Sequence, residues 1–153
     1  MADLTWVGEA PKAGELGDWP ALHGPSGDRL ARICDFVDAA ALFAGSATVN
    51  VFDEWPGPAK SGKGDAFPMR RARRLADEMR AGMAGRVVLV GRRVATAFGF
   101  AGIPPCRWED FAGLQVAMIP HPSGVNRWYN DARNKATVAV FVRAALRLSG
   151  EGA

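Results

Sequence analysis

The sequence has little of what disulfide-bonded, metal-binding and membrane proteins need. Cysteine and histidine each occur only twice, and neither Cys34 nor Cys106 stands in a Cys-x-x-Cys or Cys/His spacing. A disulfide framework, a zinc site and a four-cysteine cluster are therefore not expected, and we predict no metal and no cofactor. No apolar run approaches the roughly 18 residues of a membrane span. The first residues, "MADLTWVGEAP", lack the basic and apolar regions of a signal peptide. We therefore expect a cytoplasmic protein with reduced thiols.

Two common nucleotide-binding fingerprints are also missing. The loop after the first apolar run, "GEAPKAGELG", matches neither GxGxxG nor GxxxxGK[ST]. This weakens the hypothesis of a generic nucleotide-binding α/β protein. The chain of 153 residues has 48% hydrophobic and 23% charged residues, and we interpret it as one globular domain over residues 1–153. The net charge of +3 permits nucleic acid as a partner but does not require it.

Strand and helix patterns alternate along the chain. Short apolar runs predict four strands, over residues 4–8, 47–53, 86–91 and 114–120. Helical periodicity is clearest at Leu30, Ile33, Cys34 and Val37, which follow the i, i+3, i+4, i+7 pattern. The predicted helices cover residues 27–43, 69–83, 92–100 and 131–148. This alternation predicts a three-layer α/β/α sandwich around a central, mostly parallel four-stranded sheet.

Three of the predicted strands run into loops of unusual chemistry. These loops read "GEAPKAGE", "NVFDEWPG" and "HPSGVNRWYN". Because ligands of parallel sheets bind outside the carboxyl ends of the strands, we expect the three loops to meet at one edge. The last loop crowds an imidazole, amides, an arginine and two aromatic rings into ten residues. Such a set suits a flat, polar, negatively charged ligand.

Five segments, in order along nearly the whole chain, resemble the uracil-DNA glycosylase superfamily: "VGEAP", "HGPSGDRL", "NVFDEWPGP", "VVLVGRRVATAFG" and "IPHPSG". The nearest likeness is to the bacterial branch with Gly-Glu-Ala/Gly-Pro at the first motif and His-Pro-Ser/Ala at the last, without the iron–sulfur cysteines. No single motif is specific, so the resemblance depends on their order at matching strand ends. It implies a uracil-DNA glycosylase-like fold. It also implies a monofunctional DNA glycosylase that flips out uracil or a related modified pyrimidine, hydrolyses its N-glycosidic bond and leaves an abasic site.

The resemblance assigns chemical roles to three residues. Glu9 matches the acidic position, where a carboxylate can orient water and stabilise the positive charge on a deoxyribose losing its base. His121 matches the histidine that donates a hydrogen bond to O2 of the leaving base. Asn50 matches the asparagine whose amide pairs with the edge of the base. Glu9 and His121 are thus the predicted catalytic residues, and Asn50 is a predicted base-binding residue.

The base-stacking motif departs from the pattern of the superfamily. Relatives read "GRPFVGPSG", with a phenylalanine that stacks on the base, whereas this chain reads "GDWPALHGPSG". Leu22 falls at the phenylalanine position, His23 follows it, and Trp19 lies a few residues earlier. We therefore expect Trp19, Leu22 or His23 to contact the base, and the identity of that base stays open.

The remaining predicted site residues contact DNA. Ser26, before a helix, and Ser123 are candidates for phosphate contacts, since free helical amides favour anions. Asn126, Arg127 and Trp128 belong to the loop that wedges into the duplex in relatives, with Arg127 and Trp128 as the wedge candidates. The basic helix "MRRARRLADEMR" is either a phosphate-binding face or merely a solvated one.

Alternatives to a DNA glycosylase stay open on this sequence. One is a glycosidase that acts on a free or single-stranded modified nucleotide, and another is a non-catalytic nucleic-acid-binding member of the same fold. A pure binding protein has no need for Glu9, Asn50 and His121 together. The expected partners are DNA, single- or double-stranded, and a modified or deaminated pyrimidine base, with no membrane. We expect a monomer that is bacterial, or viral and acting in a bacterial host.

Overall fold

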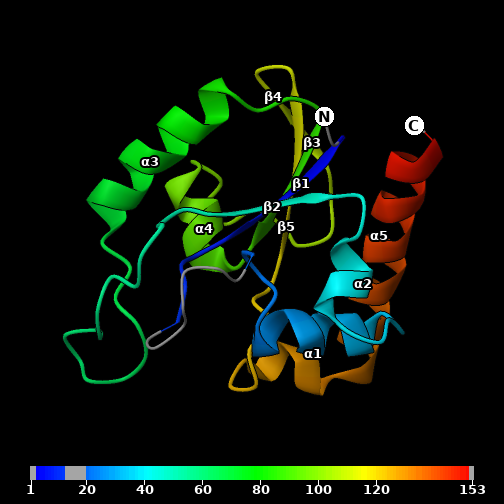
Figure 1. The fold of residues 1–153 in the computed structure, drawn as a ribbon, viewed down its shortest axis with the longest axis horizontal. Coiled ribbons are helices and arrows are strands. Elements are labelled where there is room, and N and C mark those ends of the chain that lie inside the picture. Colours follow the sequence, from blue (N-terminus) through cyan, green and yellow to red (C-terminus); the bar gives the residue numbers. More distant parts are fainter. Residues whose placement is uncertain (1–2, 13–19, 152–153) are drawn as a thin grey trace.

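A computed structural model describes residues 3–12 and 20–151, and within these ranges one five-stranded sheet forms the centre of the molecule (Figure 1). The strand order is β2-β1-β3-β5-β4. Neighbours pair in parallel except β4, which runs antiparallel to β5. The strands are β1 (Leu4–Gly8), β2 (Ala47–Asn50), β3 (Arg86–Val90), β4 (Glu109–Phe111) and β5 (Leu114–Ile119). The predicted α/β class with a mostly parallel sheet is therefore confirmed.

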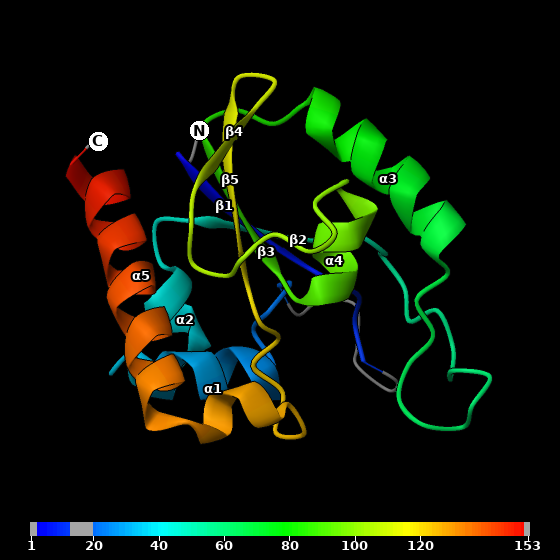
Figure 2. The ribbon, with the colours of Figure 1, turned by 180° about the vertical axis from the view of Figure 1, so that it is seen from behind.

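Helices cover both faces of this sheet, as Figures 1 and 2 show from opposite sides. The helices are α1 (Pro25–Ile33), α2 (Ala39–Phe43), α3 (Met69–Ala81), α4 (Arg92–Ala97), the 3-10 helix η1 (Arg127–Asn130) and α5 (Ala132–Glu151). Successive residues of β3 point to opposite faces. Val88 and Val90 join the core with α1, α2 and α5, whereas Val87 and Leu89 join the core with α3 and α4. The result is the expected three-layer arrangement.

The prediction of a four-stranded sheet is wrong, because the described residues form a sheet of five strands. β4 is three residues long, exposed at two of them, and lies at the edge of the sheet. It reaches β5 through Ala112 and Gly113, which both have positive φ, at 50° and 85°. Two positive φ values are typical of a tight type I′ hairpin turn, whose usual signal is Asn-Gly or Asp-Gly. Ala-Gly at this turn, with a short polar strand before it, gave no hairpin signal.

The predicted helix over residues 27–43 is also wrong, because the chain breaks between α1 and α2. Asp35 has a φ of 63°, and Asp38 caps α2 by accepting a hydrogen bond from the Ala41 amide at 2.9 Å. Asp28 of α1 accepts another from the Ala39 amide at 2.9 Å, which fixes α2 against α1. Val37, which the periodicity placed on the apolar face of the predicted helix, is 83% exposed. The local hydrogen bonds of the aspartates outcompete a continuous helix.

No helix within the described ranges is long and apolar enough to cross a membrane.

Candidate active site

The carboxyl ends of the parallel strands surround a cavity of about 310 Å³. Asn50 ends β2, Glu9 directly follows β1, and His121 comes two residues after β5. All three line this cavity, as do Leu22 and Ser26. The strand order places Asn50, Glu9, Gly91 and His121 in sequence along the edge, since Gly91 directly follows β3. The expectation that the loops after these strands meet at one edge is confirmed.

Glu9 is held by an arginine that the sequence reasoning did not single out. Arg93, in the first turn of α4, places Nη2 at 2.5 Å from Oε1 of Glu9 and Nε at 3.2 Å from Oε2. This two-pronged contact fixes the plane of the carboxylate as well as its position. The Glu9 side chain is 19% exposed and lines the cavity.

Arg93 also contacts the long loop between β2 and α3. Its Nη1 donates to the carbonyl of Asp65 at 3.0 Å, and its guanidinium lies 5.2 Å from the centre of the Phe67 ring. Lys12 forms a further ion pair with Asp65 at 3.6 Å. Lys12, Asp65 and Ala66 all line the cavity. Arg93 therefore links Glu9, which follows β1, to the loop that lines one side of the cavity.

Gly91 lies beside both Glu9 and His121. A Cβ at Gly91 would lie 3.4 Å from Cβ of His121 and 3.6 Å from Oε2 of Glu9, so a side chain there would lie against both groups. Gly91 also has a φ of 105°, which disfavours other residues. Burial lowers the pKa of His121 and outweighs the opposing effect of Glu9, while Lys12 and Arg93 lower it further. The imidazole is therefore held in its neutral form near neutral pH.

Two side chains, those of Tyr129 and Asn126, hold the backbone of the loop that carries His121. The hydroxyl of Tyr129, which is fully buried, donates to the carbonyl of Pro120 at 2.6 Å. Burial raises the pKa of Tyr129, so the phenol stays a donor. Asn126 donates from Nδ2 to the carbonyl of His121 at 2.9 Å and accepts from the Trp128 amide at 3.1 Å. Asn126, predicted to contact DNA, therefore also sets the geometry of the histidine loop.

Asn50 lies across Gly8, its partner in the β1–β2 register. A Cβ at Gly8 would come within 2.6 Å of Oδ1 of Asn50 and 2.8 Å of Cδ2 of Leu22, so glycine makes room for both side chains. The Asn50 amide forms no hydrogen bond with the described residues, and its donors and acceptor remain open to a ligand.

Leu22 occupies a strained backbone position beside this amide. Its φ is 66°, a region that residues other than glycine, asparagine and aspartate rarely adopt. Its carbonyl lies only 1.6 Å from where a Cβ of Gly27 would stand, so glycine at 27 permits this close approach. Of the three predicted stacking candidates, Leu22 lines the cavity. His23 instead contacts the Phe43 ring at 5.4 Å and the carbonyl of Ala21 at 2.9 Å, and Trp19 lies outside the described residues.

Phe52 is an aromatic residue of the cavity that the sequence reasoning missed. It lines the cavity two residues after β2, and its ring packs edge-on against Phe67 at 5.2 Å. Val51 and Phe52 both join the core with α3 and α4, so side chains do not alternate sides after β2 and strand periodicity would not have found Phe52.

Of the predicted DNA-contacting residues, Ser26 lines the cavity, whereas Ser123, Arg127 and Trp128 do not. Ser26 and Ser123 are half-buried, and within the described part of the chain neither hydroxyl forms a hydrogen bond. Arg127 is exposed, whereas Trp128 is half-buried with its ring 5.0 Å from that of Tyr129. Val125, at the tip of the same loop, is 89% exposed and was not singled out from the sequence.

Among residues 3–12 and 20–151, no three His, Cys, Asp or Glu side chains are grouped so that they could hold a metal ion. Cys34 and Cys106 are both free thiols, and burial raises their pKa values to about 12 and about 11. Neither cysteine lines the cavity.

The comparisons with known proteins give no assignment for this arrangement. A scan against protein-family models finds no match, and a search of curated proteins finds none either.

Proposed function

We propose that the protein is a uracil-DNA glycosylase-like hydrolase that cleaves the N-glycosidic bond of uracil or a related modified pyrimidine in DNA and leaves an abasic site. The observation that carries the proposal is the convergence of Glu9, Asn50 and His121 in one cavity from three separate strand ends. A carboxylate, an unpaired amide and a neutral imidazole meet the three needs of this reaction. They supply water activation, base recognition and stabilisation of the leaving group.

Base recognition falls to Asn50 and its aromatic neighbour. The amide offers one acceptor and two donors, which match the N3–H and O4 of a uracil ring. Phe52 forms part of the apolar wall of the cavity although only 1% of its surface is exposed, and Leu22 bounds the cavity near Asn50. The cavity is about twice the ~150 Å³ that holds a benzene ring in an engineered protein. It therefore has room for a pyrimidine with its sugar or with a substituent on the ring.

His121 assists the departure of the base. As the bond between the sugar C1′ and the base nitrogen breaks, its electron pair stays on the base and negative charge builds on O2. A neutral imidazole can donate one hydrogen bond to that oxygen without itself losing a proton. The lowered pKa of His121 keeps this neutral donor available at physiological pH.

Glu9 activates the attacking water, and Arg93 holds Glu9 in position. The carboxylate accepts a proton from the water whose oxygen bonds to C1′, and its charge stabilises the oxocarbenium character of the sugar. Arg93 does not reach this chemistry itself but holds the carboxylate through both oxygens. The leaving base anion takes up a proton from solvent, so the reaction consumes one water and yields a free base and an abasic sugar.

A glycosidase acting on single-stranded DNA or a free nucleotide is the second candidate, and the histidine loop favours it. Filling the gap left in a duplex requires exposed side chains on the loop beside the cavity. Trp128 packs onto Tyr129, so the exposed side chains available in this loop are Val125 and Arg127. Such a small wedge suits substrates whose bases are already unstacked, because extrusion costs least there.

A panel of substrates tests the proposal. The protein would be incubated with oligonucleotides that carry uracil, hydroxymethyluracil, a thymine mismatch or other modified pyrimidines, as single strands and duplexes. The matching free nucleotides would be tested in parallel. Alkali-labile abasic sites, formed by the protein and not by Glu9→Gln, are the expected result. Base release from free nucleotides alone would support the second candidate. No release from any substrate would overturn both.

A further inference from the structure

Four arginines crowd the first two turns of α3 on the solvent side. Arg70, Arg71, Arg73 and Arg74 are all exposed, and we call them the α3 arginine face. None of the four forms an ion pair or a hydrogen bond with the residues that the structure describes. Arg80 of the same helix differs, because it binds Asp77 and the carbonyl of Phe98 and stacks on the ring of Phe111.

This arrangement is unfavourable for the isolated helix. The amino-terminal end of a helix carries partial positive charge, and the first turn of α3 contains no acidic residue to offset it. Arg70 is also three and four positions from Arg73 and Arg74, the spacing at which like charges repel on a helix. Residues that break local rules in this way are expected where a ligand compensates for them.

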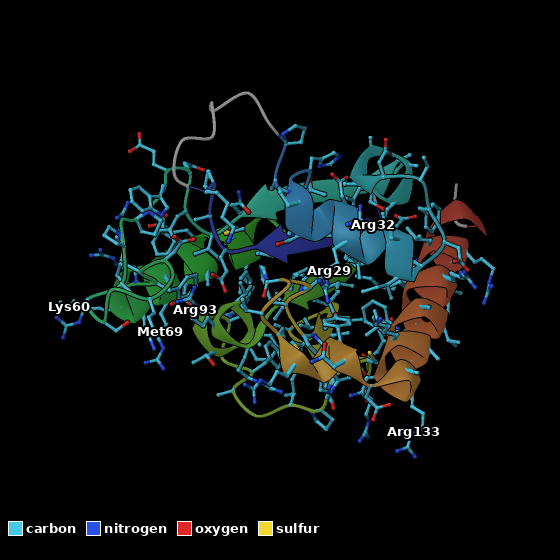
Figure 3. The ribbon with its side chains drawn as sticks, turned by 90° about the horizontal axis from the view of Figure 1, so that it is seen from below. Arg29, Arg32, Lys60, Met69, Arg93 and Arg133 are labelled. Carbon is cyan, nitrogen blue, oxygen red and sulfur yellow. The ribbon has the colours of Figure 1, made fainter. Side chains whose placement is uncertain are left out.

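The α3 arginine face adjoins the proposed active site. The guanidinium of Arg71 lies 5.2 Å from the centre of the Phe52 ring, and Phe52 lines the cavity. Arg93 lies over Phe67, two residues before α3 begins. Figure 3 shows Met69, the first residue of α3, on the same side of the molecule as Arg93 and Lys60, and away from Arg133. The amino-terminal end of α3 therefore lies near residues that line the cavity, and Arg71 connects the α3 arginine face to them.

We infer that the α3 arginine face binds the phosphates of the nucleic-acid strand that extends from the nucleotide held in the cavity. The inference deepens the proposed function, and the choice of nucleic acid as the anion rests on it. From Arg70 to Arg74 the helix rises about 6 Å. This length covers about two phosphates along one strand of B-DNA, at about 3.4 Å each. Guanidinium groups pair with phosphates bidentately and stay charged at all physiological pH values.

A charge-neutralising variant tests this contact. Arg70→Gln, Arg73→Gln and Arg74→Gln would be combined, with Arg71 kept because it packs on Phe52. Glutamine has nearly the helix propensity of arginine, so α3 should persist. The matched control combines Arg32→Gln, Arg107→Gln and Arg147→Gln, three exposed arginines of other elements. Both variants lose three positive charges.

Binding to an unmodified oligonucleotide, which the protein cannot cleave, would be measured by fluorescence anisotropy at several salt concentrations. The α3 variant should show a slope of log affinity against log salt that is shallower by about 2 to 3. Its Tm should rise by about 2–4 °C, because repulsion in the first two turns is removed. The control should keep most of the wild-type slope and show no rise in Tm. The inference would be overturned if the α3 variant kept the salt slope of the wild type. It would also be overturned if the α3 variant and the control lost equal amounts of slope.

Two further measurements separate this inference from the proposed function. Vesicles with anionic lipid would be tested in the same titration, and loss of vesicle binding with unchanged oligonucleotide binding would overturn nucleic acid as the partner. Base release would be measured on a trinucleotide, which is too short to extend along α3. Normal release there, with an unchanged salt slope, would refute the α3 contact alone. A shallower slope without base release on any substrate would refute the glycosidase activity alone.

Discussion

At the scale of single residues, the contact between Arg93 and Glu9 decides how the carboxylate can act. Both oxygens of Glu9 are engaged by one guanidinium that is itself held by the carbonyl of Asp65. In the proposed reaction, water activation needs the carboxylate at one distance and angle from C1′, and a misplacement of about 1 Å can reduce a rate on the order of 10². We therefore propose that Arg93 is a positioning residue whose effect should appear in kcat.

We expect Arg93→Gln to slow base release on the order of 10² while the KM for an oligonucleotide changes little. The matched control is Arg92→Gln, since Arg92 neighbours Arg93 on α4 but donates to the carbonyl of Ile103, away from Glu9. Steady-state kinetics and a thermal melt would be recorded for both variants. Normal kcat in Arg93→Gln would show that Glu9 needs no fixed orientation.

The protonation of His121 gives a second prediction at this scale. Burial lowers its pKa, Glu9 raises it, and Arg93 lowers it. Glu9→Gln should therefore lower the pKa of His121 further, and Arg93→Gln should raise it. Because the lowered pKa preserves the neutral imidazole, base release should hold as the pH falls and be lost only once His121 becomes protonated.

Titration of the imidazole by NMR, with His23→Gln to assign the two histidines, would be compared with the pH dependence of kcat. If the imidazolium were the active form, kcat would increase on acidification through the same pKa. Unchanged titration in both variants would show that the contacts of Glu9 and Arg93 do not reach the imidazole.

The residues that sequence reasoning finds and misses differ in a physical way. Glu9, Asn50 and His121 lie at the ends of strands or within two residues of them, so strand patterns alone place them at one edge. Arg93 and Phe52 gain their roles from packing, since Arg93 is 84 positions from Glu9 in the chain. Their contacts depend on strand order and side-chain direction, which periodicity does not give. Val125 was missed because one exposed apolar residue in a loop has no pattern.

At the scale of elements, the loop from His121 to η1 has separate structural and exposed parts. Tyr129 and Asn126 hold the backbone around His121, and Trp128 packs beside them. Val125 extends from the tip of the loop with 89% of its surface exposed. Apolar side chains in such positions can insert between bases and stabilise a flipped nucleotide. For the proposed function we therefore propose that Val125, rather than Trp128, is the wedge, because Trp128 packs on Tyr129.

Val125→Ser should cut base release from a paired duplex more than from a single strand, because unstacking and unpairing cost a few kcal/mol only where a duplex exists. Trp128→Ala should instead lower the Tm and leave activity per folded molecule nearly unchanged. Arg127→Gln is the third variant, and a phosphate contact predicts a uniform loss on both substrates with a shallower salt dependence. Rates on both substrates, at two salt concentrations, would be measured beside thermal melts. Equal loss on single and double strands in Val125→Ser would rule out the wedge.

Elements were predicted well where apolar runs are long and poorly where short polar segments decide the backbone. β1, β3 and β5 are mostly buried, and runs rich in apolar residues mark them, with the unbroken Val-Val-Leu-Val run of β3 the clearest. The break after α1 depends on three aspartates, of which Asp28 and Asp38 bind backbone amides and Asp35 adopts positive φ. Such local bonds compete with helix formation even where the apolar spacing fits a helix.

At the scale of the whole molecule, one arginine joins α5 to the turn between α1 and α2, on the face of the sheet opposite α3 and α4. Arg143 donates from Nη2 and Nε to the carbonyl of Cys34, at 3.0 and 3.2 Å, and also binds the carboxylate of Asp35. Neither Arg143 nor its partners line the site cavity. A substitution at Arg143 should therefore lower the stability of the protein without changing its activity.

Arg143→Met should remove these bonds while it keeps the apolar stem, and should leave the Cys34 carbonyl, a half-buried acceptor, without its donor. Because the arginine side chain is 41% exposed, we expect a modest loss of about 1–2 kcal/mol in unfolding free energy. This corresponds to a Tm lower by on the order of 5 °C. Arg147→Met, one turn later on α5, is the control and should leave the Tm nearly unchanged. Base release per folded molecule should match the wild type in both variants. If Arg143→Met reduced kcat in proportion to its fall in stability, the two faces of the sheet would be mechanically coupled, and the active site could not be treated as a property of the strand ends alone.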